Sequence, residues 1–143
     1  MTLYNISRKT VIASAPLRAR TLWARTRGMI GRKFLTFDAL IFERCSAIHT
    51  VFMTQRIDVL FIGRENRILK TVESLAPWIP WCACRGGLTV IELPAGTIAR
   101  SRTAPGDYID LDAECVEEIN AGLRKVIPAG PEAQASLYGD PKS

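Results

Sequence analysis

The most apolar stretch of the chain, residues 46–62, contains the only histidine, His49, and a carboxylate, Asp58. Burying an imidazole or a carboxylate without a partner carries a large free-energy penalty. We therefore expect both side chains either to be hydrogen-bonded or to face a pocket. The stretch is β-rich and no run of about 18 apolar residues occurs anywhere in the chain, so it predicts buried strands rather than a membrane span.

Composition is consistent with one soluble globular domain, because 48% of the 143 residues are hydrophobic and 23% are charged. We place this domain at residues 16–112, after an N-terminal arm over residues 1–15. A peripheral helix is expected over 113–127. The segment 128–143, rich in Pro, Gly and Ser, predicts a disordered tail.

The pattern of apolar residues predicts an α+β fold that is mainly β. Helical spacing after Pro16, with glycines at 28 and 31, predicts an amphipathic helix from residue 16 to about 30. Apolar runs on both sides of the turn residues 63–66 predict a β-hairpin. We expect a compact antiparallel sheet or small barrel. The hairpin strands are predicted at 58–62 and 67–73, and further strands within 3–12 and at 34–43, 48–53, 88–93 and 108–111. One short helix at 97–102, capped by Thr97, is expected before the last strand.

Positive charge is concentrated near the N-terminus. The formal net charge is +5, and residues 1–37 hold eight Lys or Arg and no acid. Such a face either attracts an anionic partner or is simply solvated. A nucleic-acid partner is not expected, because the chain has no helix-turn-helix pattern and no basic stripe interleaved with aromatics. The first residues lack the apolar core of a secretory signal, which predicts a cytoplasmic protein.

Four cysteines are too few and too irregularly spaced for a disulfide framework, so reduced thiols are expected. Cys82 and Cys84 could join His49 in a three-ligand zinc site. Cys-x-Cys is not the usual zinc spacing, however, and incidental cysteines explain the pattern as well. We predict no metal and no cofactor.

Residues 75–87 contain Pro77, Pro80 and two large aromatics, Trp78 and Trp81. Proline lacks a backbone donor, so this segment is expected to be a loop. The two tryptophans either form a lid on the core or line a ligand cleft.

Three separated segments resemble the family called domain of unknown function 192: residues 25–32, residues 49–61 and residues 92–97 followed by Gly106-Asp107. The chain departs from the usual pattern at two places. It has Met29-Ile30 where the family usually has Leu-Met, and Arg56 where the family commonly has proline. The resemblance implies a compact, mainly antiparallel β fold with a small helical component, and it implies no established activity.

Polar or polarizable groups within apolar surroundings mark the candidate site. A histidine beside a carboxylate can support acid–base chemistry, yet no recognised nucleophile motif accompanies them. Each also has a structural explanation, such as a turn cap or an arginine partner for Asp58. We therefore predict an accessory module that binds a small molecule or a protein, with a hydrolase using His49 and Asp58 or Glu92 as the alternative. The predicted site residues are His49, Met53, Asp58, Trp78, Trp81 and Glu92.

Overall fold

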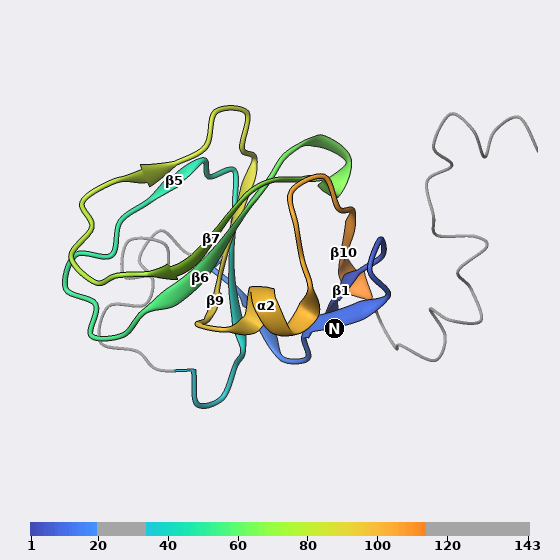
Figure 1. The fold of residues 1–143 in the computed structure, drawn as a ribbon, viewed down its shortest axis with the longest axis horizontal. Helices are drawn as coiled ribbons and strands as arrows, with labels where there is room; N and C mark the ends of the chain where they lie inside the picture. Colours follow the sequence, from blue (N-terminus) through green and yellow to red (C-terminus); the bar gives the residue numbers. More distant parts are fainter. Residues whose placement is uncertain (20–33, 114–143) are drawn as a thin grey trace, which may run out of the picture.

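The computed structural model describes residues 1–19 and 34–113, which form three β-sheets and one short α-helix. Figure 1 shows the largest sheet across the middle of the molecule, with the N-terminal strands and the last strand at one end and long loops at the other. The two ends of the molecule are therefore built differently, one from paired strands and the other mainly from loops.

Five strands form the central sheet in the order β3-β4-β9-β6-β7. β3 and β4 run parallel, and the other neighbouring pairs are antiparallel. The strands are β3 (Pro16–Arg18), β4 (Ala39–Glu43), β6 (Ile57–Ile62), β7 (Ile68–Leu75) and β9 (Thr89–Pro94).

The predicted hairpin is confirmed in β6 and β7, which are joined by the 3-10 turn η1 (Arg64–Asn66). Every residue of β6 is buried, because the strand lies between β7 and β9 and has a packed cluster on each face. This explains why the sequence of β6 is almost continuously apolar rather than alternating.

Side chains on the two faces of the central sheet belong to two different cores. One face packs with the N-terminal strands and the helix, through residues such as Leu60, Ile91 and Ile98. The other face carries Leu40, Val59 and Phe61, and partly buried aromatics and cysteines cover it. A side chain in this sheet therefore belongs to one core or the other according to its register.

A second sheet has the order β10-β1-β2, formed by β10 (Ile109–Ala113), β1 (Thr2–Asn5) and β2 (Thr10–Ala13). Asn5 is fully buried, and its amide donates to Thr103 Oγ1 at 3.1 Å and Asp107 Oδ2 at 3.0 Å. Burial alone would raise the pKa of Asp107, but hydrogen bonds from Arg8, Asn5 and the Ala104 amide outweigh it and lower that pKa. This network fastens the first strands to the loop before β10.

Three fold predictions need correction. Residues 16–18 form strand β3 rather than the first turn of a helix, and most of the predicted N-terminal helix lies outside the described residues. Within residues 1–19 and 34–113 the sheets do not close into a barrel, and the β3–β4 pair makes the main sheet mixed. The predicted strand at 48–53 shrinks to β5 (Ala47–Ile48), because the chain turns away after Ile48.

The short helix before the last strand is confirmed as α2 (Thr97–Ser101), although Thr97 does not cap it. The last strand is confirmed too: Ile109 and Leu111 are buried, while Tyr108 and Asp110 are only partly so. Ala113 belongs to β10, and the remainder of the predicted peripheral helix and the tail lies outside the described residues.

Candidate functional site

Two long segments meet at the end of the molecule away from the N-terminus. We call residues 44–56 and 76–87 the β5–β8 ribbon, because β5 pairs antiparallel with β8 (Cys82–Ala83). Ile48, Cys82 and Cys84 turn inward onto the second core. Because side chains alternate along a strand, the neighbouring residue Trp81 faces solvent, and it is 72% exposed.

Thr50 joins the two segments of the ribbon and is fully buried. Its hydroxyl donates to the Ala76 carbonyl at 2.7 Å and accepts from the Ile79 amide at 2.8 Å. Its own backbone amide donates to the Ile79 carbonyl, and its carbonyl accepts from the Trp78 and Met53 amides. One threonine therefore fixes the positions of both loops.

The two loops hold Phe52 and Trp78 against each other in an edge-to-face pair, with ring centroids 5.0 Å apart. Phe52 is nevertheless 62% exposed and Trp78 60% exposed. Both residues have φ of 65°, in the left-handed region that bulky side chains rarely adopt. Such strain persists only where the surrounding contacts impose it, and here the hydrogen bonds of Thr50 do so.

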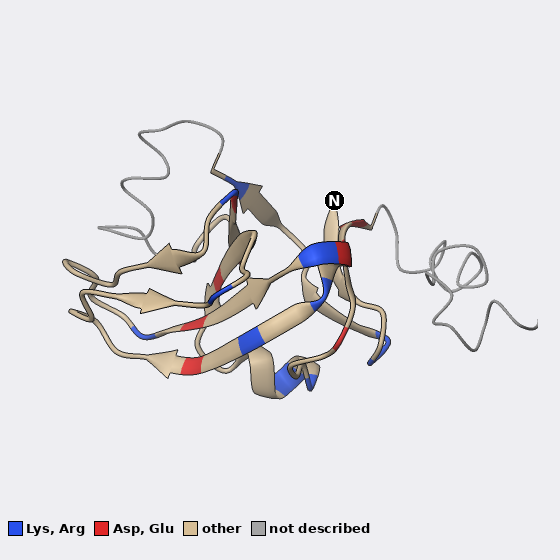
Figure 2. Ribbon diagram, turned by 90° about the horizontal axis from the view of Figure 1, so that it is seen from above, with Lys and Arg blue, Asp and Glu red and all other residues tan. Residues whose placement is uncertain are grey.

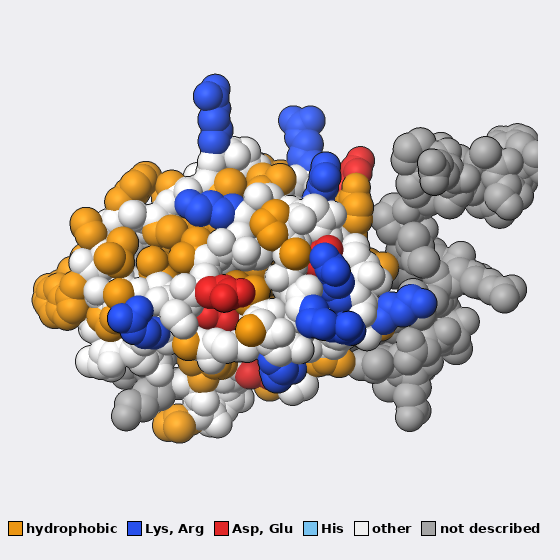
Figure 3. Space-filling model, in the orientation of Figure 1, with side chains coloured by type: hydrophobic (Ala, Val, Ile, Leu, Met, Phe, Trp, Pro, Cys, Tyr) orange, Lys and Arg blue, Asp and Glu red, His pale blue; other side chains and the backbone are white. Residues whose placement is uncertain are grey.

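The ribbon that carries this pair contains no acidic residue. The ribbon contains Arg44, Arg56 and Arg85 but no Asp or Glu, and His49 is exposed. Figure 2 shows the loops at that end in tan, and Figure 3 shows hydrophobic side chains gathered at the left end of the molecule. No helix among the described residues is long and apolar enough to cross a membrane.

We expect Thr50→Val to loosen the ribbon while leaving the central sheet intact. Losing the hydroxyl leaves the Ala76 carbonyl and the Ile79 amide without this partner, at a cost of about 2 kcal/mol. Urea denaturation measures the loss. Thr54→Val is the matched control, because Thr54 is an exposed threonine on the same loop, and an equal loss in both variants would contradict the role of Thr50.

Asp58 lies fully buried in β6 on the face of the first core, opposite Leu93. Its carboxylate accepts three backbone hydrogen bonds: Oδ1 from Ser74 at 2.9 Å, and Oδ2 from Gly96 at 3.1 Å and Ile98 at 2.9 Å. It thereby supplies the acceptor for the first turn of α2 and holds the irregular end of β7. These contacts are structural.

Glu92 lies in β9 on the opposite face of the sheet, in register with Leu40 and Val59 of the second core. Its Oε2 atom has no hydrogen-bond partner. Burial raises the pKa of Glu92 from 4.5 to about 8, because the apolar surroundings penalise the charged form. At neutral pH this side chain is a protonated acid within the core.

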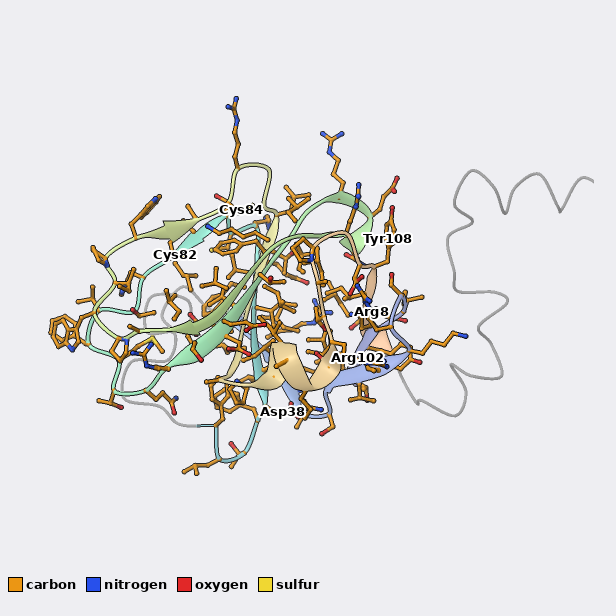
Figure 4. All side chains as sticks on the ribbon, viewed as in Figure 1. Arg8, Asp38, Cys82, Cys84, Arg102 and Tyr108 are labelled. Carbon is orange, nitrogen blue, oxygen red and sulfur yellow. The ribbon has the colours of Figure 1, made fainter. Side chains whose placement is uncertain are left out.

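Met53 is 2% exposed and packs in the second core, which agrees with its structural explanation. Figure 4 shows Cys82 and Cys84 on the ribbon. Both thiols are free and partly buried. Over residues 1–19 and 34–113, no group of three or more His, Cys, Asp or Glu is placed to hold a metal ion, so the zinc alternative for His49 with these cysteines gains no support.

The six residues predicted for the site therefore separate into two groups. Met53, Asp58 and Glu92 are buried, the last two on opposite faces of one sheet. His49, Trp78 and Trp81 are exposed on the ribbon. Sequence reasoning missed Thr50 and Phe52. The signal for both was a threonine and an aromatic residue between His49 and Met53, in a segment for which a strand was predicted.

The chain is similar in sequence to one known family and in fold to a solved structure. The family model DUF192, described as Uncharacterized ACR, matches residues 6–111. The UPF0127 protein of Thermococcus sibiricus is 32% identical over 121 residues, which cover 80% of this chain and 73% of that protein. A crystal structure of a protein of unknown function from Novosphingobium aromaticivorans superposes with a TM-score of 0.67 at 21% identity, covering 77% of this chain and 84% of that one.

Proposed function

Since the chain belongs to the DUF192 family of uncharacterised proteins, whose description carries no activity, we propose a function from geometry: a small non-enzymatic binding module. Its contact surface is the aromatic end of the β5–β8 ribbon, formed by Phe52, Trp78 and Trp81. The observation that carries the proposal is the strained, exposed Phe52–Trp78 pair.

Two costs are combined in that pair. Large aromatic side chains left in water forgo the free energy of burial, and left-handed backbone at two bulky residues adds strain. A core-covering lid would recover the first cost by burying the rings, but here both rings are more than half exposed. A partner that buries the rings recovers it instead.

The exposed fractions favour a projecting surface over a deep pocket, since the lining of a pocket is largely shielded from solvent. In this proposal His49, Trp78 and Trp81 belong to the contact surface. Met53, Asp58 and Glu92, predicted from the sequence as part of one pocket, are buried and lie outside this contact surface.

The alternative, a hydrolase using His49 with Asp58 or Glu92, finds no supporting observation in the geometry. Both oxygens of Asp58 already accept backbone hydrogen bonds, and Glu92 is enclosed in the second core. His49 is on the exposed ribbon instead. A general base needs hydrogen-bond reach of its substrate, and neither buried carboxylate is open to one.

The proposal is tested with 8-anilinonaphthalene-1-sulfonate, an aromatic dye that fluoresces on apolar surfaces. We expect Phe52→Ala/Trp78→Ala to weaken dye binding about fivefold or more, because the variant removes most of the exposed ring area. The free energy of unfolding should change by less than about 1 kcal/mol, as is usual for exposed positions.

Leu35→Ala is the matched control, since Leu35 is 84% exposed and lies outside the ribbon. Dye binding should be unchanged in this variant. Equal binding by the wild type and the double variant would refute the aromatic end as the contact surface.

A further inference from the structure

We propose that the partner of the β5–β8 ribbon is an anionic lipid bilayer, onto which the aromatic end docks peripherally. This inference rests on the proposed function and names its partner. It is carried by two features of the same ribbon: three exposed aromatic rings at one end, and positive charge with no acid along both segments.

The rings fit the boundary between headgroups and acyl chains. Aromatic side chains, tryptophan above all, concentrate at that depth, because their apolar rings and polar N–H suit a half-wet environment. Phe52 and Trp78 project from two neighbouring loop tips, and Trp81 faces outward just before β8. Figure 3 shows hydrophobic side chains gathered at the left end of the molecule.

Charge along the ribbon favours an anionic surface. Arg44, Arg56 and Arg85 are exposed, and neither segment contributes a carboxylate that would repel lipid phosphate. The Arg56 guanidinium donates to the Ser74 carbonyl of β7, which keeps this side chain close to the main sheet. Basic side chains held near an anionic leaflet each add to the attraction, within a Debye length of the surface.

The backbone of the ribbon keeps the rings available. An aromatic side chain in water lowers its free energy by folding back onto the protein. Hydrogen bonds from Thr50 to both loops, and the left-handed conformations at Phe52 and Trp78, hold these rings outward instead. Insertion therefore requires no rearrangement of the loops.

Single-stranded nucleic acid also binds aromatic and basic surfaces, but it favours a groove in which open ring faces alternate with cations. Here Phe52 and Trp78 pack edge to face on each other. Arg44 and Arg85 flank the paired strands β5 and β8 on the side away from His49 and Trp81, rather than lying between the rings. A bilayer needs only apolar rings in front and cations behind.

The test is flotation of the full chain with phosphatidylcholine vesicles, with and without phosphatidylglycerol. We expect binding to the anionic vesicles, reduced more than about tenfold in Phe52→Ser/Trp78→Ser/Trp81→Ser. Arg85→Gln should lower affinity for the anionic vesicles about fivefold. Leu35→Ser, the matched exposed control, should bind like the wild type.

Three results would overturn the inference. Vesicle binding equal in the wild type and the triple variant would place the contact elsewhere. Absent vesicle binding, with dye binding that still depends on Phe52 and Trp78, would remove the lipid partner but leave the proposed function standing. Binding of an oligothymidylate that needs the same three rings, without vesicle binding, would assign the surface to single-stranded nucleic acid.

Discussion

Asp58→Ala is expected to lower the free energy of unfolding by about 4 kcal/mol, because three backbone amides that donate to the buried carboxylate, one buried and two partly buried, would lose this acceptor. The Gly96 and Ile98 amides begin α2, and the Ser74 amide sits at the irregular end of β7. Urea denaturation followed by far-UV circular dichroism measures the loss. For a domain of this size the melting temperature should fall by about 15 °C.

Asp58→Asn keeps the volume but offers only one acceptor oxygen. That oxygen can serve Gly96 and Ile98, whereas the new amide group then faces the Ser74 N–H. An intermediate loss is therefore expected. Asp110→Ala, at a partly exposed position of the last strand, controls for the removal of a carboxylate. Equal stability of Asp58→Ala and the wild type would contradict the assigned role.

Stability is expected to fall as the pH rises from about 4.5 to 8, and Glu92→Gln is expected to abolish most of that fall. Burial raises the pKa of Glu92 to about 8 in the folded protein, against 4.5 for an exposed glutamate. Between these values the folded state holds a proton that the unfolded state has released, so each step up in pH favours unfolding. The full difference is on the order of 5 kcal/mol.

Glutamine resembles the protonated acid in size and carries no titrating group. The Glu92→Gln variant should be the more stable protein at pH 8, with little difference from the wild type at pH 4.5. Glu73→Gln, at an exposed position of β7, is the matched control and should keep the wild-type profile. Parallel pH profiles for the wild type and Glu92→Gln would show that Glu92 is not the group responsible.

Most of the strands could be predicted from local sequence patterns, because the signal for each strand lies in residues that are neighbours in the sequence. The hairpin at β6 and β7 followed from apolar runs around a turn, and the alternation at 109–111 followed from burial on one face. The parallel pairing of β3 with β4 could not be predicted from such local patterns. Residues 16–18 suit the start of a helix equally well, and only contacts with Ala39, Leu40 and Ile41 select a strand.

The six residues that the sequence grouped as one candidate site do not lie together in the structure. His49 and Asp58 are close in sequence, yet one is exposed on the ribbon and the other is buried beneath α2. The hydrogen bonds of Asp58 fit its structural explanation, a cap on a turn, better than a place in a pocket. Which face of the sheet Glu92 occupies depends on its register with Leu40 and Val59, and register is a property of paired strands.

The pairing of β1 with β10 has a consequence for how the chain is made. Thr2 lies opposite Ala113, and the buried side-chain NH2 group of Asn5 donates to Thr103 and Asp107. At about 5–20 residues per second, a ribosome needs several seconds or more to deliver those residues. During that interval Leu3 and Tyr4, both destined for complete burial, remain open to chaperones. β1 is therefore synthesised before the residues of β10 that complete its pairing.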